Sequence, residues 1–150
     1  MTPSLRLATP HDQQIIEQIL RDAFSRYIVR MGRKPQPMLD DYSDPIKDNK
    51  VYVVERDGTV QGTVMLATDH EAMHLEILAV APSAQGSGLG RMLVEFVDDS
   101  ARKAGYHTVK LHTNVTMVEN IAMYSRVGYV ETHRIEENGF NRVYMAKNLG

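Results

Sequence analysis

Apolar residues follow two different spacings along this chain, and the two spacings predict two kinds of element. Two long stretches carry apolar residues every three or four positions, the period of a helix that packs one face on a core. The first stretch, residues 10–27, opens with the capping-box spacing of Thr9 and Asp12. The second covers about residues 88–104 and is followed by Gly105, a residue type that often ends helices. We expect the buried faces to be formed by Ile15, Ile16, Ile19, Leu20, Ala23, Phe24 and Tyr27 in the first helix, and by Leu89, Met92, Leu93, Phe96, Val97, Ala101 and Ala104 in the second.

Shorter apolar runs, rich in β-branched residues and bounded by turn residues, predict strands. Asp57-Gly58 and Asn138-Gly139 each join two such runs, and both pairs are typical of two-residue hairpin turns. Gly62 lies inside one run and indicates a bulge or a close approach of another backbone. The predicted strands are residues 4–8, 51–56, 59–68, 73–80, 107–113, 129–135 and 140–146.

The order of these elements predicts an α/β (α+β) fold with a mixed, mostly antiparallel sheet of about seven strands and about four helices. A strand, a helix and a strand in succession around the second long helix imply one parallel pair. Thr116 and Glu119 have capping-box spacing, which predicts a short helix that ends at Gly128. Residues 28–50 contain three prolines, so we expect only short helical pieces there, around Met38–Tyr42 and near Ile46.

Length and composition limit the classes of function. The 150 residues fit one domain, residues 1–150, with 43% apolar and 24% charged residues, as in ordinary globular proteins. There is no cysteine, which excludes disulfides and a cysteine nucleophile, and no histidine spacing indicates a metal site. A net charge of −2 without a basic run argues against nucleic acid. No apolar run is long enough for a membrane span and no signal peptide is apparent, so the expected location is cytoplasmic.

The richest chemical signal is the turn Gln85–Arg91, which places three alternating glycines where the second long helix begins. A helix N-terminus offers unpaired N–H groups and partial positive charge, and glycine lets a ligand approach the backbone, so this turn could hold a phosphate. A P-loop needs Lys and Ser/Thr after its last glycine, but Arg91-Met92 follows Gly90. A dinucleotide fingerprint needs a third glycine where Arg91 stands. A glycine-rich turn without any ligand is the remaining structural alternative.

Two motifs resemble those of the GNAT acetyltransferases. Gln85-x-x-Gly88-x-Gly90, after the strand that ends Leu78-Ala79-Val80-Ala81-Pro82, resembles the coenzyme-A motif of that family. Downstream, Asn120, Tyr124 and Gly128-Tyr129 resemble its second signature, although Ala122 comes one place later than the usual alanine. The order of elements also matches over nearly the whole chain. The resemblance implies a GNAT domain whose sheet splays between the fourth and fifth strands, and it leans toward a homodimer.

The resemblance implies a binding site for coenzyme A, with acetyl-CoA as co-substrate and no metal. The pyrophosphate would lie on the backbone of the glycine turn, the pantetheine arm would bond the end of the preceding strand, and Asn120 would contact the arm from the short helix. Arg91 either adds charge to the phosphate or is a solvated cation. The implied cofactor-binding residues are Leu78, Ala79, Val80, Gln85, Gly86, Ser87, Gly88, Leu89, Gly90, Arg91 and Asn120.

The implied reaction is direct acyl transfer to an amine, because an acyl-cysteine intermediate is impossible here. Glu76 lies four residues before Val80 on the same strand face and is the candidate general base, with His74 and His112 as alternative bases or relays. Tyr124 is the candidate acid for the departing thiolate, because its ordinary pKa near 10 keeps it protonated at neutral pH. An N–H of Ala79 or Val80 would donate to the thioester oxygen.

The acceptor is less well defined than the cofactor. We expect it among residues 26–48, the loop 114–117 and the hairpin 135–140. Basic residues in the first segment suit an acidic acceptor, and acidic residues there suit a polyamine or aminoglycoside. A peptide N-terminus or a lysine side chain is a further possible acceptor. The pairs that distinguish these two cases are Arg30 and Arg33 on one side, and Asp40 and Asp41 on the other. A different class of function, a non-catalytic acyl-CoA sensor, would need the turn and Asn120 but neither Glu76 nor Tyr124.

Overall fold

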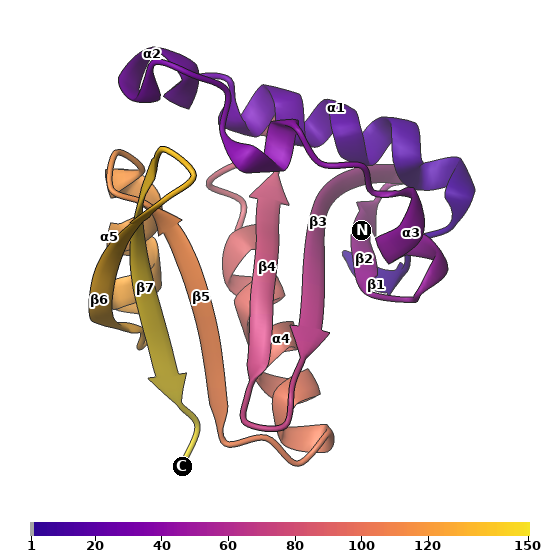
Figure 1. Cartoon of the computed structure of the whole chain (residues 1–150). Coiled ribbons are helices and arrows are strands. Elements are labelled where there is room, and N and C mark those ends of the chain that lie inside the picture. The colour runs from indigo at the N-terminus through magenta and orange to yellow at the C-terminus, as the bar shows by residue number, and fades with distance from the viewer. Residues whose placement is uncertain (1) are drawn as a thin grey trace. The chain divides into compact units, whose positions relative to one another are not determined.

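The computed structural model describes residues 2–150 (Figure 1). Seven strands are hydrogen-bonded in the order β1-β2-β3-β4-β5-β7-β6. The strands are β1 (Ser4–Leu7), β2 (Val51–Arg56), β3 (Thr59–Thr68), β4 (Met73–Val80), β5 (Thr108–Asn114), β6 (Val130–Glu137) and β7 (Phe140–Asn148). The helices are α1 (Gln13–Phe24), α2 (Tyr27–Met31), α3 (Ser43–Lys47), α4 (Leu89–Lys103) and α5 (Val118–Arg126), with single 3-10 turns at Pro10–Asp12, Gln36–Met38 and Pro82–Ala84. The predicted fold class is confirmed, with five helices where about four were expected.

One parallel pair interrupts the antiparallel pattern, as the order of elements predicted. β4 and β5 run parallel, and their register joins Met73 with Val109 and His74 with Lys110. α4 connects these two strands, which is the crossover that a parallel pair requires. β5–β7, β6–β7, β1–β2 and β2–β3 are antiparallel.

The described residues form two compact units. The first comprises the residues up to Leu66 and Ile77–Leu93, and the second comprises Ala67–Glu76 and Val94–Gly150. The expectation of a single domain over residues 1–150 therefore stays a prediction. In the first unit, α1 buries the face that its apolar spacing predicts, with Ile16, Ile19, Leu20 and Phe24 inaccessible, whereas Ile15 is 38% exposed.

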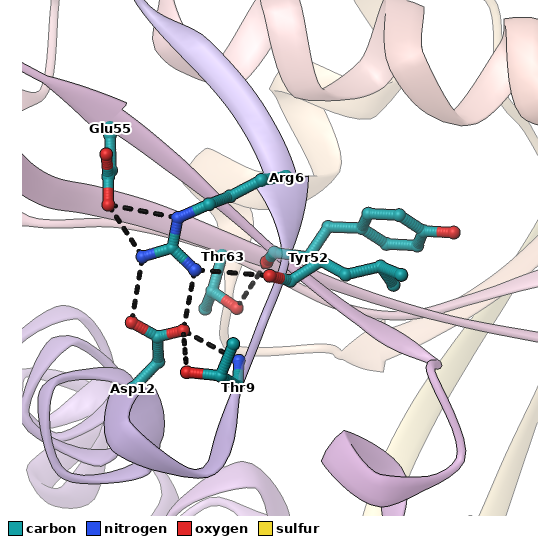
Figure 2. A network of polar contacts seen from close by, with 7 residues as sticks. Arg6, Thr9, Asp12, Tyr52, Glu55 and Thr63 are labelled. Carbon is teal, nitrogen blue, oxygen red and sulfur yellow. Dashed lines mark hydrogen bonds and ion pairs between the residues drawn. The ribbon is translucent and has the colours of Figure 1, made fainter.

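An arginine network ties the entry of α1 to the sheet (Figure 2). The guanidinium of Arg6 on β1 donates to both carboxylate oxygens of Asp12, at 2.7 and 3.0 Å, and to Glu55 Oε1 on β2, at 2.6 and 3.0 Å. The Asp12 carboxylate also accepts the backbone N–H of Thr9 at 2.7 Å, which is one half of the predicted capping box. These bonds lower the pKa of Asp12 from 3.8 to about 2, and the bond from Arg6 contributes most.

The depressed pKa of Asp12 predicts a loss of stability in acid. The unfolded state binds more protons than the folded state between pH 4 and 2, so the stabilisation is complete above about pH 4 and declines as pH falls toward 2. Because Arg6 is partly exposed, we discount the shift and expect about 1–2 kcal/mol. In urea denaturation, the free energy of unfolding of Asp12→Asn should be lower than that of wild type by this amount at pH 7, and by less near pH 2.5. Asp99→Asn, in an exposed ion pair on α4, is the control, and a difference for Asp12→Asn that does not change with pH would contradict the assignment.

Two local expectations are wrong. The helical turn expected around Met38–Tyr42 lies earlier, at Gln36–Met38. The helix expected to begin with Thr116 as its cap begins one residue later, and Asn114 Oδ1 accepts both the Thr116 N–H, at 3.0 Å, and the Thr116 hydroxyl, at 2.8 Å. Met117 is consequently the N-cap residue of α5, without a side-chain cap. An Asx turn at the end of β5 has replaced the cap that the local sequence favours.

Candidate functional site

The turn between β4 and α4 is fixed by hydrogen bonds within the first unit. The N–H of Ala81 donates to the carbonyl of Gln61 at 2.8 Å, which anchors the end of β4. The side-chain amide of Gln85 donates to the carbonyl of Val80 at 3.2 Å, and the Ser87 hydroxyl donates to the carbonyl of Ala84. The polar side chains of the turn therefore bond to its own carbonyl groups, while Gln85, Gly86, Ser87 and Gly88 are exposed.

The three glycines of the turn differ in whether their backbone conformation requires glycine. Gly86 and Gly88 have φ values of +81° and +88°, a conformation that disfavours every residue with a Cβ atom. Gly90 has no positive φ and lies in the first turn of α4, where an added Cβ would meet no atom within 4 Å. The fold thus requires glycine at 86 and 88 but not at 90. The small size of residue 90 leaves open space beside the helix N-terminus, whose first N–H groups have no intrahelical acceptor.

The end of β4 is held in place by a close approach at Gly62 on β3. A Cβ at Gly62 would lie 2.9 Å from Val54 Cγ1 and 3.2 Å from the carbonyl oxygen of Ala79, so only glycine fits. The register of β2 also shifts between Val54 and Glu55, beside this contact. The prediction of a bulge or close approach at Gly62 is confirmed. It fixes the backbone of the segment that the resemblance assigns to the pantetheine arm.

The candidate bases lie in the second unit and differ in their surroundings. Glu76 is exposed on β4, so the dry environment expected for its carboxylate is absent in this structure. His74 Nε2 lies 2.7 Å from Asp69 Oδ2, and the hydrogen bond to His74 is the main reason that the pKa of Asp69 lies well below its ordinary value. This bond engages His74 at the turn between β3 and β4, which fits a sheet histidine better than a free base.

His112 belongs to a row of rings across β5, β7 and β6. Its ring lies 5.4 Å from that of Tyr144, and the ring of His133 stacks on the other side of Tyr144 at 4.5 Å. His112 is exposed as a whole residue, yet its ring beside Tyr144 is partly desolvated. This desolvation, followed by the positive charge of Arg142, lowers the pKa of His112. The imidazole is therefore held neutral to lower pH than usual.

The short helix α5 carries the second set of candidate residues. Tyr124 is buried, at 7% exposure, and its ring meets that of Tyr129 edge-on at 5.5 Å. Asn120 is half-buried one turn earlier on the same face, and its amide lies 3.8 Å from the sulfur of Met117. Both residues therefore share the helix face that the motif spacing predicts.

A largely buried ion pair lies against the ring of Tyr129, and its one indication in the sequence is an aspartate on the apolar face of α4. Lys147 Nζ on β7 is 2.5 Å from Asp98 Oδ2 and lies 5.7 Å from the centre of the Tyr129 ring. Asp98 Oδ1 and the Tyr129 hydroxyl are buried without a hydrogen-bond partner among residues 2–150. Burial, followed by the charge of Asp98, raises the pKa of Tyr129, so its hydroxyl stays protonated.

The candidate residues thus divide between the two units. The turn Gln85–Arg91 and the segment Leu78–Val80 belong to the first, and Glu76, Asn120 and Tyr124 belong to the second. Among residues 2–150 there is no group of three or more His, Asp or Glu side chains arranged to hold a metal ion. None of the helices described is long and apolar enough to cross a membrane.

A mixed sheet with one parallel pair, and a glycine-rich turn leading from one of those strands into the crossover helix, is the arrangement of an acetyltransferase fold. The chain belongs to the GNAT family of acetyltransferases, whose sequence model matches residues 14–129. The resemblance found in the two motifs is thereby confirmed, and acetyl transfer is the general activity of the family.

Similar proteins agree with this membership. The IAA acetyltransferase of Azospirillum brasilense is 36% identical over 56% of this chain and 56% of its own length, so the match spans little more than half of that relative. The S-(2-succino)cysteine N-acetyltransferase of Bacillus subtilis is 28% identical over 99% of this chain and 98% of its own. Among solved structures, the PaiA N-acetyltransferase of Thermoplasma acidophilum in complex with coenzyme A is similar in fold, with a TM-score of 0.82, 15% identity and 99% coverage of both chains.

Proposed function

We propose that this protein transfers an acetyl group from acetyl-CoA directly to a primary amine of a small molecule or peptide, through a ternary complex. The turn Gln85–Arg91 carries the proposal. Its exposed backbone, its two positive-φ glycines and the open space at Gly90 form a cradle at the start of α4 that suits a pyrophosphate. In this family such a ligand is acyl-CoA, and solved neighbours contain coenzyme A or acetyl-CoA.

In the proposed complex the N–H groups of Gln85–Arg91 bind the pyrophosphate. The backbone of Leu78–Val80 bonds the pantetheine amides as an added strand would, and Asn120 contacts the arm from α5. The parallel ladder between β4 and β5 that the structure records is confined to Met73 and His74 at the start of β4. This supports a role for the later residues of β4 as partners of the arm.

The proposed chemistry requires a base for the acceptor and an acid for the departing thiolate. Glu76 accepts a proton from the ammonium form of the acceptor, directly or through water, because its exposed carboxylate is in contact with solvent. The neutral amine attacks the carbonyl carbon, an N–H of Ala79 or Val80 stabilises the oxyanion, and the C–S bond breaks. Tyr124 gives its proton to the departing thiolate and regains one from the product nitrogen through solvent. His112 is the alternative base, since its lowered pKa keeps it neutral.

The alternative function is a non-catalytic acyl-CoA sensor. It would use Gln85–Arg91 and Asn120 and have no need of a buried tyrosine on the same helix face. The arrangement of Asn120 and Tyr124 on one face of α5 favours the enzyme.

An acceptor panel tests the proposal. Calorimetry should detect acetyl-CoA binding to wild type, and a panel of amino acids, polyamines, aminoglycosides and peptides should reveal at least one acceptor by release of free thiol. Glu76→Gln should keep acetyl-CoA affinity and lower turnover. Binding without turnover on any amine would favour the sensor, and absence of binding would rule out both functions.

A further inference from the structure

A hollow of about 340 Å³ lies in the second unit, where the loop after β5 meets the hairpin of β6 and β7. Its lining combines aliphatic and basic side chains: Val115, Arg134, Ile135, Glu136, Asn141 and Arg142. A volume of this size holds a small ligand or the end of a larger one. The assigned cofactor-binding and catalytic residues do not include any of these side chains, and the hollow lies at the loop 114–117 and the hairpin 135–140, where the acceptor is expected.

Arg142 is the fixed cation of this hollow. Its side chain is only 15% exposed, its Nη1 donates to Glu137 Oε2 at 2.6 Å, and its guanidinium lies 5.7 Å from the centre of the Phe140 ring. Glu137 is held in turn, because the Tyr144 hydroxyl donates to Glu137 Oε1 at 2.6 Å. These contacts preorganise the guanidinium before any ligand arrives.

The same guanidinium keeps donors for a ligand. Of its five N–H groups, one on Nη1 donates to Glu137, and the Tyr144 hydroxyl also interacts with this side chain, so further donors remain for a ligand. A planar guanidinium with remaining donors matches a carboxylate or phosphonate, which it binds through parallel hydrogen bonds. The other arginine, Arg134, is 59% exposed and is already held by Glu131 through two bonds of 3.0 Å, and Glu136 is exposed at the rim. Arg142 is therefore the residue that would select an anion.

The hollow lies at the carboxyl end of β5. Arg142 is opposite Asn114, the last residue of β5, and the N–H of Val115 donates to the carbonyl of Asn141 at 3.0 Å. Figure 1 shows the turn between β6 and β7 at the same end of the second unit as the carboxyl end of β5 and the start of α5.

We propose that Arg142 binds an anionic group of the amine acceptor, so that the preferred acceptors are small amines that also carry a carboxylate or a phosphonate. This inference rests on the proposed acetyl transfer. Val115 and Ile135 supply apolar walls for a short aliphatic segment between the anion and the amine. The fixed guanidinium would orient the acceptor, which favours binding of anionic amines over neutral amines of the same size.

Matched acceptors test this selection with wild type and acetyl-CoA. Free α-amino acids should be acetylated with kcat/KM at least 10-fold higher than their α-carboxamides. Comparison of the amino acids with an aminoalkylphosphonate shows whether the carboxylate or the phosphonate is preferred. In Arg142→Gln, KM for the anionic acceptors should rise 10- to 100-fold with little change in kcat, while the carboxamides are unaffected. Arg142→Lys should restore part of the preference. Arg102→Gln, the same change at an exposed position of α4, is the control and should alter neither constant.

Other results separate this inference from the proposed function. If carboxamides and free acids are acetylated equally by wild type, the anion site is wrong although acetyl transfer stands. If Arg142→Gln loses both acceptor types equally while its acetyl-CoA affinity and thermal stability match wild type, Arg142 does not recognise the anion. If it is unstable, the double variant Arg142→Gln/Glu137→Gln removes both charges, and retention of the preference for free acids by that variant would overturn the proposal. Absence of thiol release with every amine would instead contradict acetyl transfer itself.

Discussion

Tyr124→Phe is expected to lower kcat for acetyl transfer by about 10²- to 10⁴-fold, the range that a positioned acid or base contributes. The change removes the proton proposed for the departing thiolate and keeps the ring that packs against Tyr129 at 5.5 Å. Acetyl-CoA affinity should therefore change little. Thiol release under saturating acetyl-CoA and acceptor measures kcat, and calorimetry measures the affinity.

Tyr129→Phe provides the matched control for that variant. It removes the same hydroxyl from the neighbouring ring, and this hydroxyl has no hydrogen-bond partner among the described residues. Loss of an unsatisfied buried hydroxyl should leave stability equal or higher, and kcat should stay near wild type. Equal kcat for Tyr124→Phe and wild type would remove the acid role, and equal losses in both variants would indicate a packing effect instead.

Gly90→Leu is expected to weaken acetyl-CoA binding at least 100-fold without lowering the free energy of unfolding. A Cβ added at this position meets open space in the protein itself, and leucine forms helices better than glycine. In the proposed complex that space lies beside the pyrophosphate, so an isobutyl group would block the approach of the ligand to the first turn of α4. Calorimetry and urea denaturation measure the two quantities.

Gly90→Ala distinguishes size from conformation. It adds one methyl group, should stabilise the helix by up to about 1 kcal/mol, and should bind acetyl-CoA within a few-fold of wild type. If Gly90→Leu binds as tightly as wild type, the pyrophosphate does not lie beside the first turn of α4. If Gly90→Leu and Gly90→Ala both unfold more easily than wild type, glycine is required by the fold after all.

The types of element could be predicted because their signals are local. Asp57-Gly58 and Asn138-Gly139 were recognised as hairpin turns, and all four residues have the positive φ values that such turns require, from +52° to +80°. The same holds for the helix stripes, since a 3.6-residue period is visible in any single stretch. Thr116 is the exception, because its N–H and hydroxyl donate to Asn114 and the N-cap residue of α5 is Met117.

The glycine turn could be assigned for a related reason. A phosphate cradle is built from consecutive backbone groups, so one short motif contains nearly all of it. The environment of the catalytic candidates could not be read in this way. Glu76 was expected in a partly dry setting and is exposed, and His74 is engaged by Asp69, because solvent access depends on which segments cover a strand end.

By itself, the sequence determined the seven strands, the two long helices, the parallel pair and the position of the candidate phosphate turn, because each follows from periodicity, turn residues or a contiguous motif. Only the tertiary structure decided which distant charges meet: Arg6 with Glu55, and Asp98 with Lys147, pairs that are each 49 residues apart. It also decided that Gly90, unlike Gly86 and Gly88, is not required by the backbone. The proposed role of Arg142 likewise depends on the pairing of β6 and β7, because Glu137, which holds the guanidinium, is close in sequence but meets Arg142 only through the folded hairpin.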